Sequence, residues 1–320
     1  MSTPDFARYA REAAGLIGAD FLDLDEGRGY LWRISRNGRY VLGGAGSICA
    51  YPINSATAYA IARDKAHAKS VLKADGLPVI PGGLFFSHTR RLALRDPGRE
   101  PGDALDLALR IGFPVFCKPN TASRGDYAEV IAGPDELRDY VRRIAPVYES
   151  FLLEPVMHGE EHRILVCDGG AVFHGVRSPP VIRGDGRRTV RQLIADLDTT
   201  YLAPGLSATP VYGHAPDRVP MKDERIELAG RRNLAAAGSF KRLSETAPPA
   251  MSAIALKAVA SLGLRIGAVD IFDCSETGPV HEPVIIEVNG NPGLKLLEMA
   301  GRQDIIRSIW TQMYEECLSG

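Results

Sequence analysis

Two short apolar segments near the end of the chain, residues 267–272 and 285–293, constrain its fold more than any other feature. Both are rich in β-branched residues and bounded by turn formers, a pattern that predicts β-strands. The polar stretch at 273–279 between them has the composition of a turn that closes a hairpin. We therefore expect two antiparallel strands here, with the middle of one beside the middle of the other.

Three polar side chains interrupt these apolar segments: Asp270 in the first, and Glu287 and Asn289 in the second. Glu287 and Asn289 are two residues apart, so their side chains lie on the same face of a strand. A hairpin brings Asp270 to them, and two carboxylates with an amide oxygen suit Mg²⁺, which prefers hard oxygen ligands. The alternative is an ordinary solvated strand face, but three such residues beside an Asn-Pro-Gly exit favour a metal site.

The composition excludes several classes of protein. The chain has 320 residues, of which 45% are hydrophobic and 24% charged, as in a globular protein large enough for two or three domains. Its net charge of −1 offers no basic field for nucleic acid. Five dispersed cysteines without a Cys-x-x-Cys pair indicate reduced thiols. With no signal peptide and no apolar run long enough to span a membrane, we expect a cytoplasmic protein without a membrane partner.

Hydrophobic periodicity predicts the elements of the N-terminal part. The helical spacing of apolar residues within 1–20 predicts an amphipathic helix. Asn37-Gly38, between apolar segments 30–34 and 39–42, is a strong hairpin signal. The segment 54–65 then leads into a helix from Ala66 to Asp75, which Gly76 stops.

Strands and helices alternate through the rest of the chain, without an internal repeat. Lys118 ends one of the apolar strands, and a buried lysine is costly unless it meets an anion. The expected strands are 84–86, 113–118, two within 151–166, and 171–177; the expected helices are 102–111, 134–147, 248–262, 294–300 and 303–317.

The motif D-x(n)-E-V-N-x-N-P-G that ends at Gly293 resembles the C-terminal metal-binding signature of the ATP-grasp superfamily, whose members are mostly carboxylate–amine ligases. The segment 179–194, with its Gly-Asp-Gly and Thr-Val, is similar to the corresponding part of the cyanophycin synthetase and bifunctional glutathione synthetase families. The resemblance covers about residues 52–300 in unbroken motif order.

This resemblance implies a mixed α+β chain with the ATP-grasp fold, in which two subdomains grip ATP between antiparallel sheets. It implies a reduced N-terminal domain at 1–60 and an ATP-grasp domain at 61–320. Within the latter, we expect a small subdomain at about 80–155 and a C-terminal subdomain with the metal site at about 156–320.

By the same resemblance, the polar groups bind ATP and its metal. Asp270, Glu287 and Asn289 would hold two Mg²⁺ ions, with Mn²⁺ as an alternative metal, against the β- and γ-phosphates. Lys65 and Lys118 would contact the phosphates.

Further positions are assigned by the resemblance to the nucleotide and the reacting groups. Backbone groups at the hinge would pair with adenine and Glu161 would accept the ribose hydroxyls; the hinge residues are Glu154, Pro155 and Val156. Ala268 stands where many ligases carry an arginine that stabilises the oxyanion, so Arg163 and Arg177 are expected to do that work, the alternative for Arg163 being an exposed strand charge. Lys241 or Arg242 would approach the γ-phosphate.

Three segments depart from the family pattern or leave alternatives open. The phosphate loop 121–127 has one glycine and includes Arg124, which would supply charge that backbone amides supply elsewhere. A cluster of five arginines between 177 and 191 is either an anion site or a solvated helix start. The segments 199–220 and 231–239 are expected near the substrate, but 231–239 has Ala and Gly-Ser where relatives have Ser and Gly-Gly.

The first hypothesis is therefore an ATP-dependent ligase that joins a carboxylate to an amine through an acylphosphate, releasing ADP and phosphate. The alternatives are a phosphotransferase of the same fold and a nucleotide-binding module without turnover. The complete metal set, Asp270, Glu287 and Asn289, argues against a binding module without turnover. The expected partners are small-molecule carboxylate and amine substrates, and the resemblance also implies a homodimer.

Overall fold

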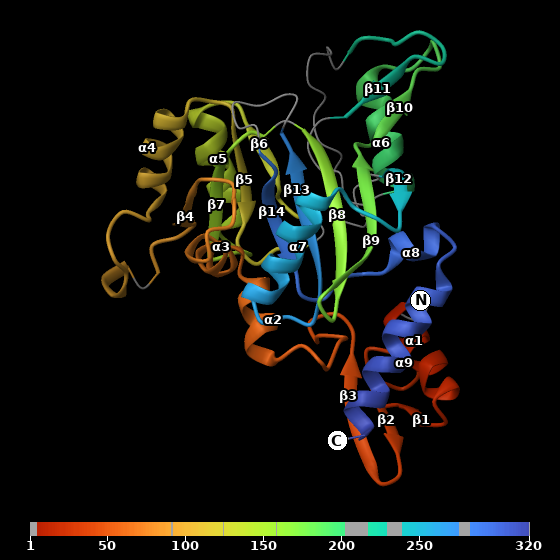
Figure 1. The fold of residues 1–320 in the computed structure, drawn as a ribbon. Coiled ribbons are helices and arrows are strands. Elements are labelled where there is room, and N and C mark those ends of the chain that lie inside the picture. Colours follow the sequence, from red (N-terminus) through yellow and green to blue (C-terminus); the bar gives the residue numbers. More distant parts are fainter. Residues whose placement is uncertain are drawn as a thin grey trace.

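The computed structural model describes residues 5–90, 92–123, 125–157, 159–201, 217–228, 239–274 and 282–319. Helices and antiparallel sheets alternate along the chain, and the sheets form separate units that lie side by side (Figure 1). The α+β fold class predicted from the sequence is confirmed.

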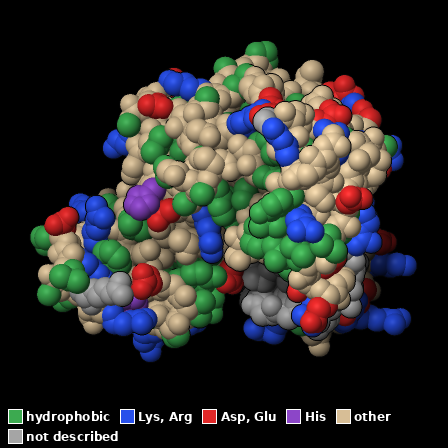
Figure 2. Space-filling view, turned by 90° about the horizontal axis from the view of Figure 1, so that it is seen from below, with side chains coloured by type: hydrophobic (Ala, Val, Ile, Leu, Met, Phe, Trp, Pro, Cys, Tyr) green, Lys and Arg blue, Asp and Glu red, His purple; other side chains and the backbone are tan. Residues whose placement is uncertain are grey.

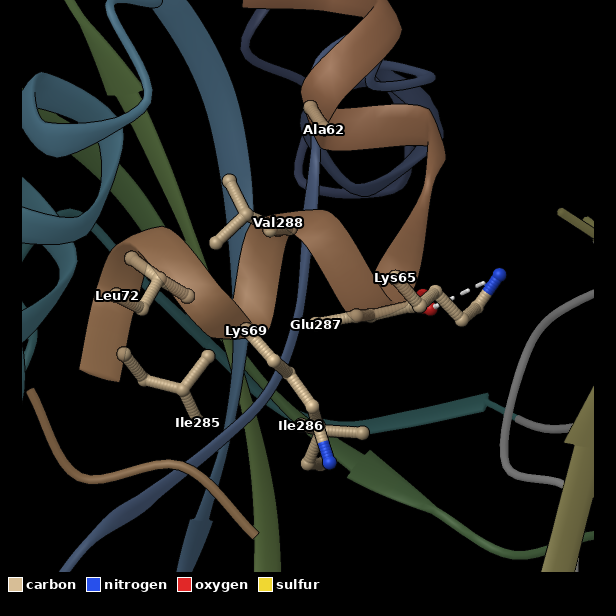
Figure 3. Close-up of a pocket in the computed structure, with 9 residues that line it drawn as sticks. Ala62, Lys65, Lys69, Leu72, Ile285, Ile286, Glu287 and Val288 are labelled. Carbon is tan, nitrogen blue, oxygen red and sulfur yellow. Dashed lines mark ion pairs between the residues drawn. The ribbon is translucent and has the colours of Figure 1, made fainter. Parts of the chain in front are cut away.

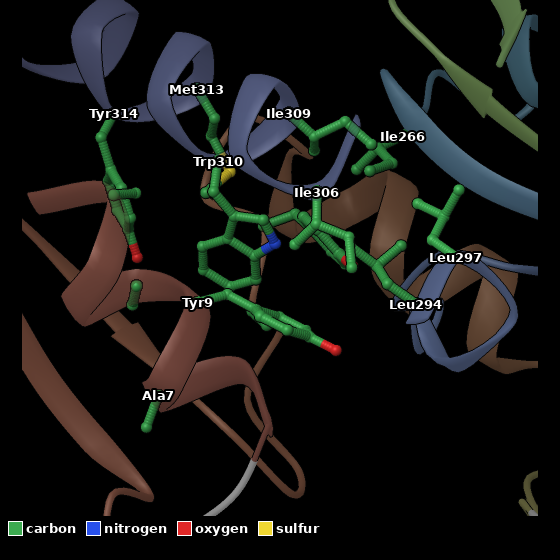
Figure 4. Packing of buried hydrophobic residues seen from close by; sticks show 14 of the residues in the cluster. Ala7, Tyr9, Ile266, Leu294, Leu297, Ile306, Ile309, Trp310, Met313 and Tyr314 are labelled. Atoms are coloured by element: carbon green, nitrogen blue, oxygen red, sulfur yellow. The ribbon is translucent and has the colours of Figure 1, made fainter. Parts of the chain in front are cut away.

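The two ends of the described chain share one hydrophobic core. Helix α1 (Asp5–Leu16) and the three-stranded sheet β1 (Asp20–Asp23), β2 (Leu31–Arg36) and β3 (Arg39–Gly44) pack against the C-terminal helix α9 (Gln303–Ser319). Trp310 of α9 is fully buried, and its ring packs against Tyr9 of α1 (Figure 4) and against Tyr51. The predicted hairpin at Asn37-Gly38 is confirmed, with positive φ at both residues, as a tight hairpin turn requires.

A four-stranded antiparallel sheet forms the unit on the left of Figure 1. Its order is β4 (Gly83–Phe86), β7 (Ser150–Pro155), β5 (Val115–Pro119) and β6 (Glu129–Ile131). Helices α4 (Pro101–Ile111) and α5 (Pro134–Ile144) pack on it around buried aromatic residues such as Tyr140 and Phe151. A short 3-10 helix, η1 (Leu92–Leu94), precedes α4.

A five-stranded antiparallel sheet forms the centre of the molecule. Its order is β12 (Ser239–Ser244), β9 (Gly170–Ser178), β8 (Glu160–Cys167), β13 (Ile266–Asp273) and β14 (Val284–Asn289). Helices α2 (Ala56–Arg63), α3 (Lys65–Ala74) and α7 (Pro249–Ser261) bury apolar side chains against one face. The other face carries apolar residues toward α8 (Lys295–Met299) and α9 at one end, and charged residues at the other.

The strands that flank the predicted hinge, β7 and β8, belong to different sheets. The chain therefore crosses from the four-stranded to the five-stranded sheet between Pro155 and Glu160. Figure 2, seen from below, shows a hollow between these units, with basic and acidic side chains along it. Gly159 at this crossing has φ +153, and an added Cβ would lie 2.2 Å from the carbonyl oxygen of Asp273, so the crossing requires glycine.

The predicted arginine cluster is divided between two places. Arg177 lies on β9 of the central sheet, whereas the others belong to a small unit of β10 (Val181–Arg183), β11 (Arg225–Glu227) and α6 (Val190–Tyr201). Arg188 binds Asp185 and Asp196, and Arg191 binds Asp217. These carboxylates offset much of the charge of the segment, and both interpretations of the arginine cluster stay predictions.

No helix in the described part of the chain is both long enough and apolar enough to cross a lipid bilayer.

We predict that stability falls between pH 6.5 and pH 4 because of a buried histidine pair. Nδ1 of His162 lies 2.9 Å from Nε2 of His174, and both residues are buried. Burial, with His162 and Arg242 nearby, lowers the pKa of His174 from 6.5 to about 4. The unfolded chain takes up a proton in this range and the folded chain does not, so the free energy of unfolding should fall by about 1 kcal/mol per pH unit.

Urea titrations at several pH values would measure this slope. His174→Gln should flatten it, and His67→Gln, at a side chain that is 73% exposed, should leave it unchanged. An equal slope in wild type and His174→Gln would contradict the prediction.

Candidate functional site

The candidate site lies on the charged end of the central sheet, where three strands place polar residues side by side. Arg163 on β8 is opposite Asp270 on β13, which is opposite Glu287 on β14. Residues opposite each other in an antiparallel sheet project from the same face. Asn289 is two residues from Glu287 and projects from this face too. The structure therefore brings Asp270, Glu287 and Asn289 together, in the hairpin predicted from the sequence.

Asp270 is bound by two arginines. It is only 3% exposed, and its Oδ1 and Oδ2 each lie 2.7 Å from a nitrogen of Arg163, Nε and Nη2 respectively. Nη2 of Arg177 lies 3.4 Å from the same Oδ2, and Nε of Arg177 lies 3.0 Å from Glu161. This network, with two charges of each sign, holds β8, β9 and β13 in register through bonds to charged groups. Glu161, predicted to bind the ribose, and the two arginines, predicted to stabilise the oxyanion, thus belong to one network through Asp270.

Glu287 is the more accessible of the two metal-set carboxylates. Its side chain is 29% exposed, and Nζ of Lys65 lies 3.9 Å from its Oε2. Nδ2 of Asn289 donates a hydrogen bond of 3.2 Å to its Oε1. Burial alone would raise the pKa of Glu287, but Lys65, Lys118 and Arg163 lower it to about 2. Glu287 is therefore ionised at neutral pH and open on one side.

These three residues fit a Mg²⁺ ion. All offer oxygen ligands, which are hard donors, and none offers the sulfur or imidazole ligands that favour zinc. Oδ1 of Asp270, whose one arginine contact is with Arg163, keeps a second lone pair for a metal. The described residues contain no group of three or more His, Cys, Asp or Glu arranged to hold a metal. A metal here would therefore depend on Asn289 and on oxygen ligands from outside the protein.

Asn54, which is 6% exposed, fixes the ends of β13 and β14, the two strands that carry Asp270, Glu287 and Asn289. Its Nδ2 donates to the carbonyl oxygens of Ile266 and Gly290, at 2.8 and 2.9 Å. Its Oδ1 accepts from the backbone N–H groups of Arg265 and Ile266. One buried side chain thus ties the start of β13 to the end of β14, and all its bonds are made inside the protein.

The two predicted phosphate lysines approach the site from different units. Lys65 begins α3, and its Nζ donates a 2.6 Å hydrogen bond to the carbonyl oxygen of Ala122. Lys118 ends β5 and is 6% exposed. Its Nζ lies 3.0 Å from Oε2 of Glu154, and it has no acceptor with hydrogen-bond geometry among the described residues. Lys118 therefore carries a buried ammonium group with unused donors.

Lys69 belongs to this group, although the sequence analysis did not identify it. It lies one helical turn after Lys65 on α3 (Figure 3), and it binds Oε1 of Glu154. Its Nζ also donates a 2.8 Å hydrogen bond to the carbonyl oxygen of Ile80. The sequence signal that could have identified Lys69 is its spacing of four from Lys65, because residues four apart lie on the same face of a helix. The pocket drawn in Figure 3 lies between these lysines and β14.

Other predicted residues are placed less centrally. Lys241 lies on the edge strand β12, separated from β13 by β9 and β8, and its ammonium group binds Glu160. Pro155 ends β7, and Val156 follows at the crossing between the sheets. Arg124 lies outside the described residues, as do most of the predicted substrate segments 199–220 and 231–239. The roles predicted for all these residues stay predictions.

Comparison with known proteins gives relatives with named activities. The chain is 27% identical over 269 residues to a cyanophycin synthetase of Nostoc sp., an alignment that covers 78% of this chain and 28% of that protein. It is 24% identical over 259 residues to the glutathione biosynthesis bifunctional protein of Enterococcus faecalis, covering 74% of this chain and 32% of that protein. The chain thus spans less than a third of the length of these relatives. No protein-family model matches it.

Solved structures agree on the fold. A bifunctional glutathione synthetase from Pasteurella multocida superimposes with a TM-score of 0.52 at 17% identity, covering 96% of this chain and 44% of that one. A D-alanine–D-alanine ligase from Bacillus anthracis superimposes with a TM-score of 0.51 at 16% identity, covering 82% of this chain and 72% of that one. The protein has the ATP-grasp fold, and it is related to ATP-grasp ligases.

We predict that Asp270→Asn destabilises the fold. The substitution keeps the shape but removes the charge that two largely buried guanidinium groups share. Breaking a buried ion pair in this way costs about 3 kcal/mol of unfolding free energy, measurable by urea denaturation. Asp304→Asn, in an exposed pair with Arg302, should change stability little. Equal effects of the two substitutions would show that the Asp270 charge does not hold the arginines.

Proposed function

We propose that the protein is an ATP-dependent ligase that forms an amide bond between a carboxylate and an amine. The observation that carries the proposal is the arrangement where the two sheets meet. Lys118 of the four-stranded sheet, with Lys65 and Lys69 of α3, lies beside the Asp270, Glu287 and Asn289 set of the central sheet. Cations facing oxygen ligands suit a magnesium nucleotide, and the relationship to ATP-grasp ligases supports the same conclusion.

The proposed reaction proceeds through an acylphosphate. An oxygen of the substrate carboxylate attacks the γ-phosphorus of ATP, the bond from that phosphorus to the bridging oxygen breaks, and ADP leaves. The amine nitrogen then attacks the acyl carbon of the acylphosphate, loses a proton, and displaces phosphate. In this proposal Lys65 and Lys118 bind the phosphates, while Arg163 and Arg177 face the reacting carbonyl oxygen and stabilise its developing charge.

Glu287 and Asn289, with Asp270 beside them, would hold the metal. When bound, Mg²⁺ supplies positive charge at the phosphate oxygens. The hinge at Glu154, Pro155 and Val156 would present backbone groups to adenine, and Glu161 would accept the ribose hydroxyls.

An ADP-release assay with Mg·ATP tests the proposal, across carboxylates and amines offered singly and in pairs. Release that requires both partners, with the condensed product detected by mass spectrometry, would support a ligase. Release with one compound that gains phosphate would indicate a phosphotransferase. Binding of ATP without turnover on any pair would indicate a nucleotide-binding module.

We predict that Glu287→Gln lowers ADP release by more than about 100-fold, because a neutral amide replaces the most accessible anionic metal ligand. The matched control is Glu282→Gln, at an exposed residue five positions earlier in the chain. Initial rates at saturating Mg·ATP, with thermal melting to check the fold, would measure the difference. Equal rates in the two variants would remove Glu287 from the proposed metal site.

A further inference from the structure

We infer that Lys69 positions the nucleotide phosphates indirectly, by neutralising Glu154 so that Lys118 keeps a net positive charge for them. The inference deepens the proposed function and rests on the proposal that this site binds ATP.

The geometry places one buried carboxylate between two ammonium groups. Glu154 is 1% exposed. Its Oε1 accepts from Nζ of Lys69, and its Oε2 lies 3.0 Å from Nζ of Lys118. The side chains of Lys69 and Lys118 are 16% and 7% exposed. All three charges are therefore largely shielded from water. Electrostatic interactions are stronger in such a buried environment than at the protein surface.

The two lysines use their donors differently. Lys69 binds Glu154 and also donates to the carbonyl oxygen of Ile80, so its ammonium group is engaged within the protein. Lys118 has an ion pair with Glu154 but no acceptor of hydrogen-bond geometry among the described residues. Because a buried ammonium group needs acceptors, Lys118 is the lysine prepared to receive an anion.

The charge balance gives Lys69 its role. With Lys69 present, the three groups sum to one positive charge, and among the described residues Lys118 is the lysine of the pair that lacks a hydrogen-bond acceptor. Without Lys69, the Glu154–Lys118 pair sums to zero, and an entering phosphate would meet a neutralised lysine. Lys65 does not neutralise Glu154 in place of Lys69, because its Nζ donates to the carbonyl oxygen of Ala122 and its ion pair is with Glu287.

The position of Lys69 makes the same group a link between the units. Lys69 lies on α3, which packs on the central sheet, whereas Glu154 and Lys118 lie on β7 and β5 of the four-stranded sheet. The alternative role of Lys69 is therefore to hold the hinge beside Glu154. The two roles differ in the part of the nucleotide that they affect, and this difference provides the test.

The experiment measures binding by calorimetry of a Mg²⁺-bound, non-hydrolysable ATP analogue and, separately, of adenosine. Lys69→Met should weaken binding of the analogue about tenfold, while adenosine binds as in wild type, since the lost charge acts on phosphate. Lys69→Met/Glu154→Gln should restore the analogue to within about threefold of wild type. Lys73→Met, at an exposed lysine on the same helix, should bind like wild type.

Several outcomes would overturn the inference. Unchanged binding of the analogue by Lys69→Met would do so, as would equal weakening of adenosine or a double variant that stays weak. If Lys69→Met does not fold, Glu154→Gln with and without Lys69→Met replaces it, and a further loss on removing Lys69 would contradict the charge argument. Failure of the wild-type protein to bind the analogue would overturn the proposed function itself.

Discussion

Two buried carboxylates, each bound by two cationic side chains, are the interactions on which the candidate site depends. Asp270 holds Arg163 and Arg177, and Glu154 lies between Lys69 and Lys118. Taking such charges out of water costs several kcal/mol per ion unless partners are close and well oriented. The strands and helix that carry them are therefore held in one arrangement, because any other arrangement would leave a charge buried without a partner.

These two groups act at different places in the fold. The Asp270 network lies within the central sheet and fixes β8, β9 and β13 relative to one another. The Glu154 group joins that sheet to the four-stranded one, together with the hydrogen bond from the backbone of Lys65 to Asn120. The polypeptide crosses between the sheets just after Glu154. A ligand that changed the charge at Glu154 would thus act where the two units meet.

Patterns within one element predicted much of this structure. Alternation along β14 was sufficient to place Glu287 and Asn289 on one face, and the turn chemistry at 273–279 was sufficient to bring Asp270 to them. Pairings between distant elements were not predictable in this way. Nothing local shows that Arg163 would bind both oxygens of Asp270, or that carboxylates would divide the arginine cluster. Likewise, β7 and β8 are neighbours in sequence but belong to different sheets, because the crossing at Gly159 separates them.

Arginines bind Asp270 whereas lysines bind Glu154, and each type of cation suits its place in the site. Arg163 binds both oxygens of Asp270 through its planar fork, which a lysine could not do, and this makes the acidic end of the site rigid before any ligand arrives. Lysines are point charges on flexible stems, so in the proposed function Lys118 would exchange Glu154 for phosphate through movement of its side chain. In the proposed function, a rigid set of oxygen ligands beside adaptable ammonium groups would lower the cost of ordering a magnesium nucleotide, because the acidic residues are already held in place.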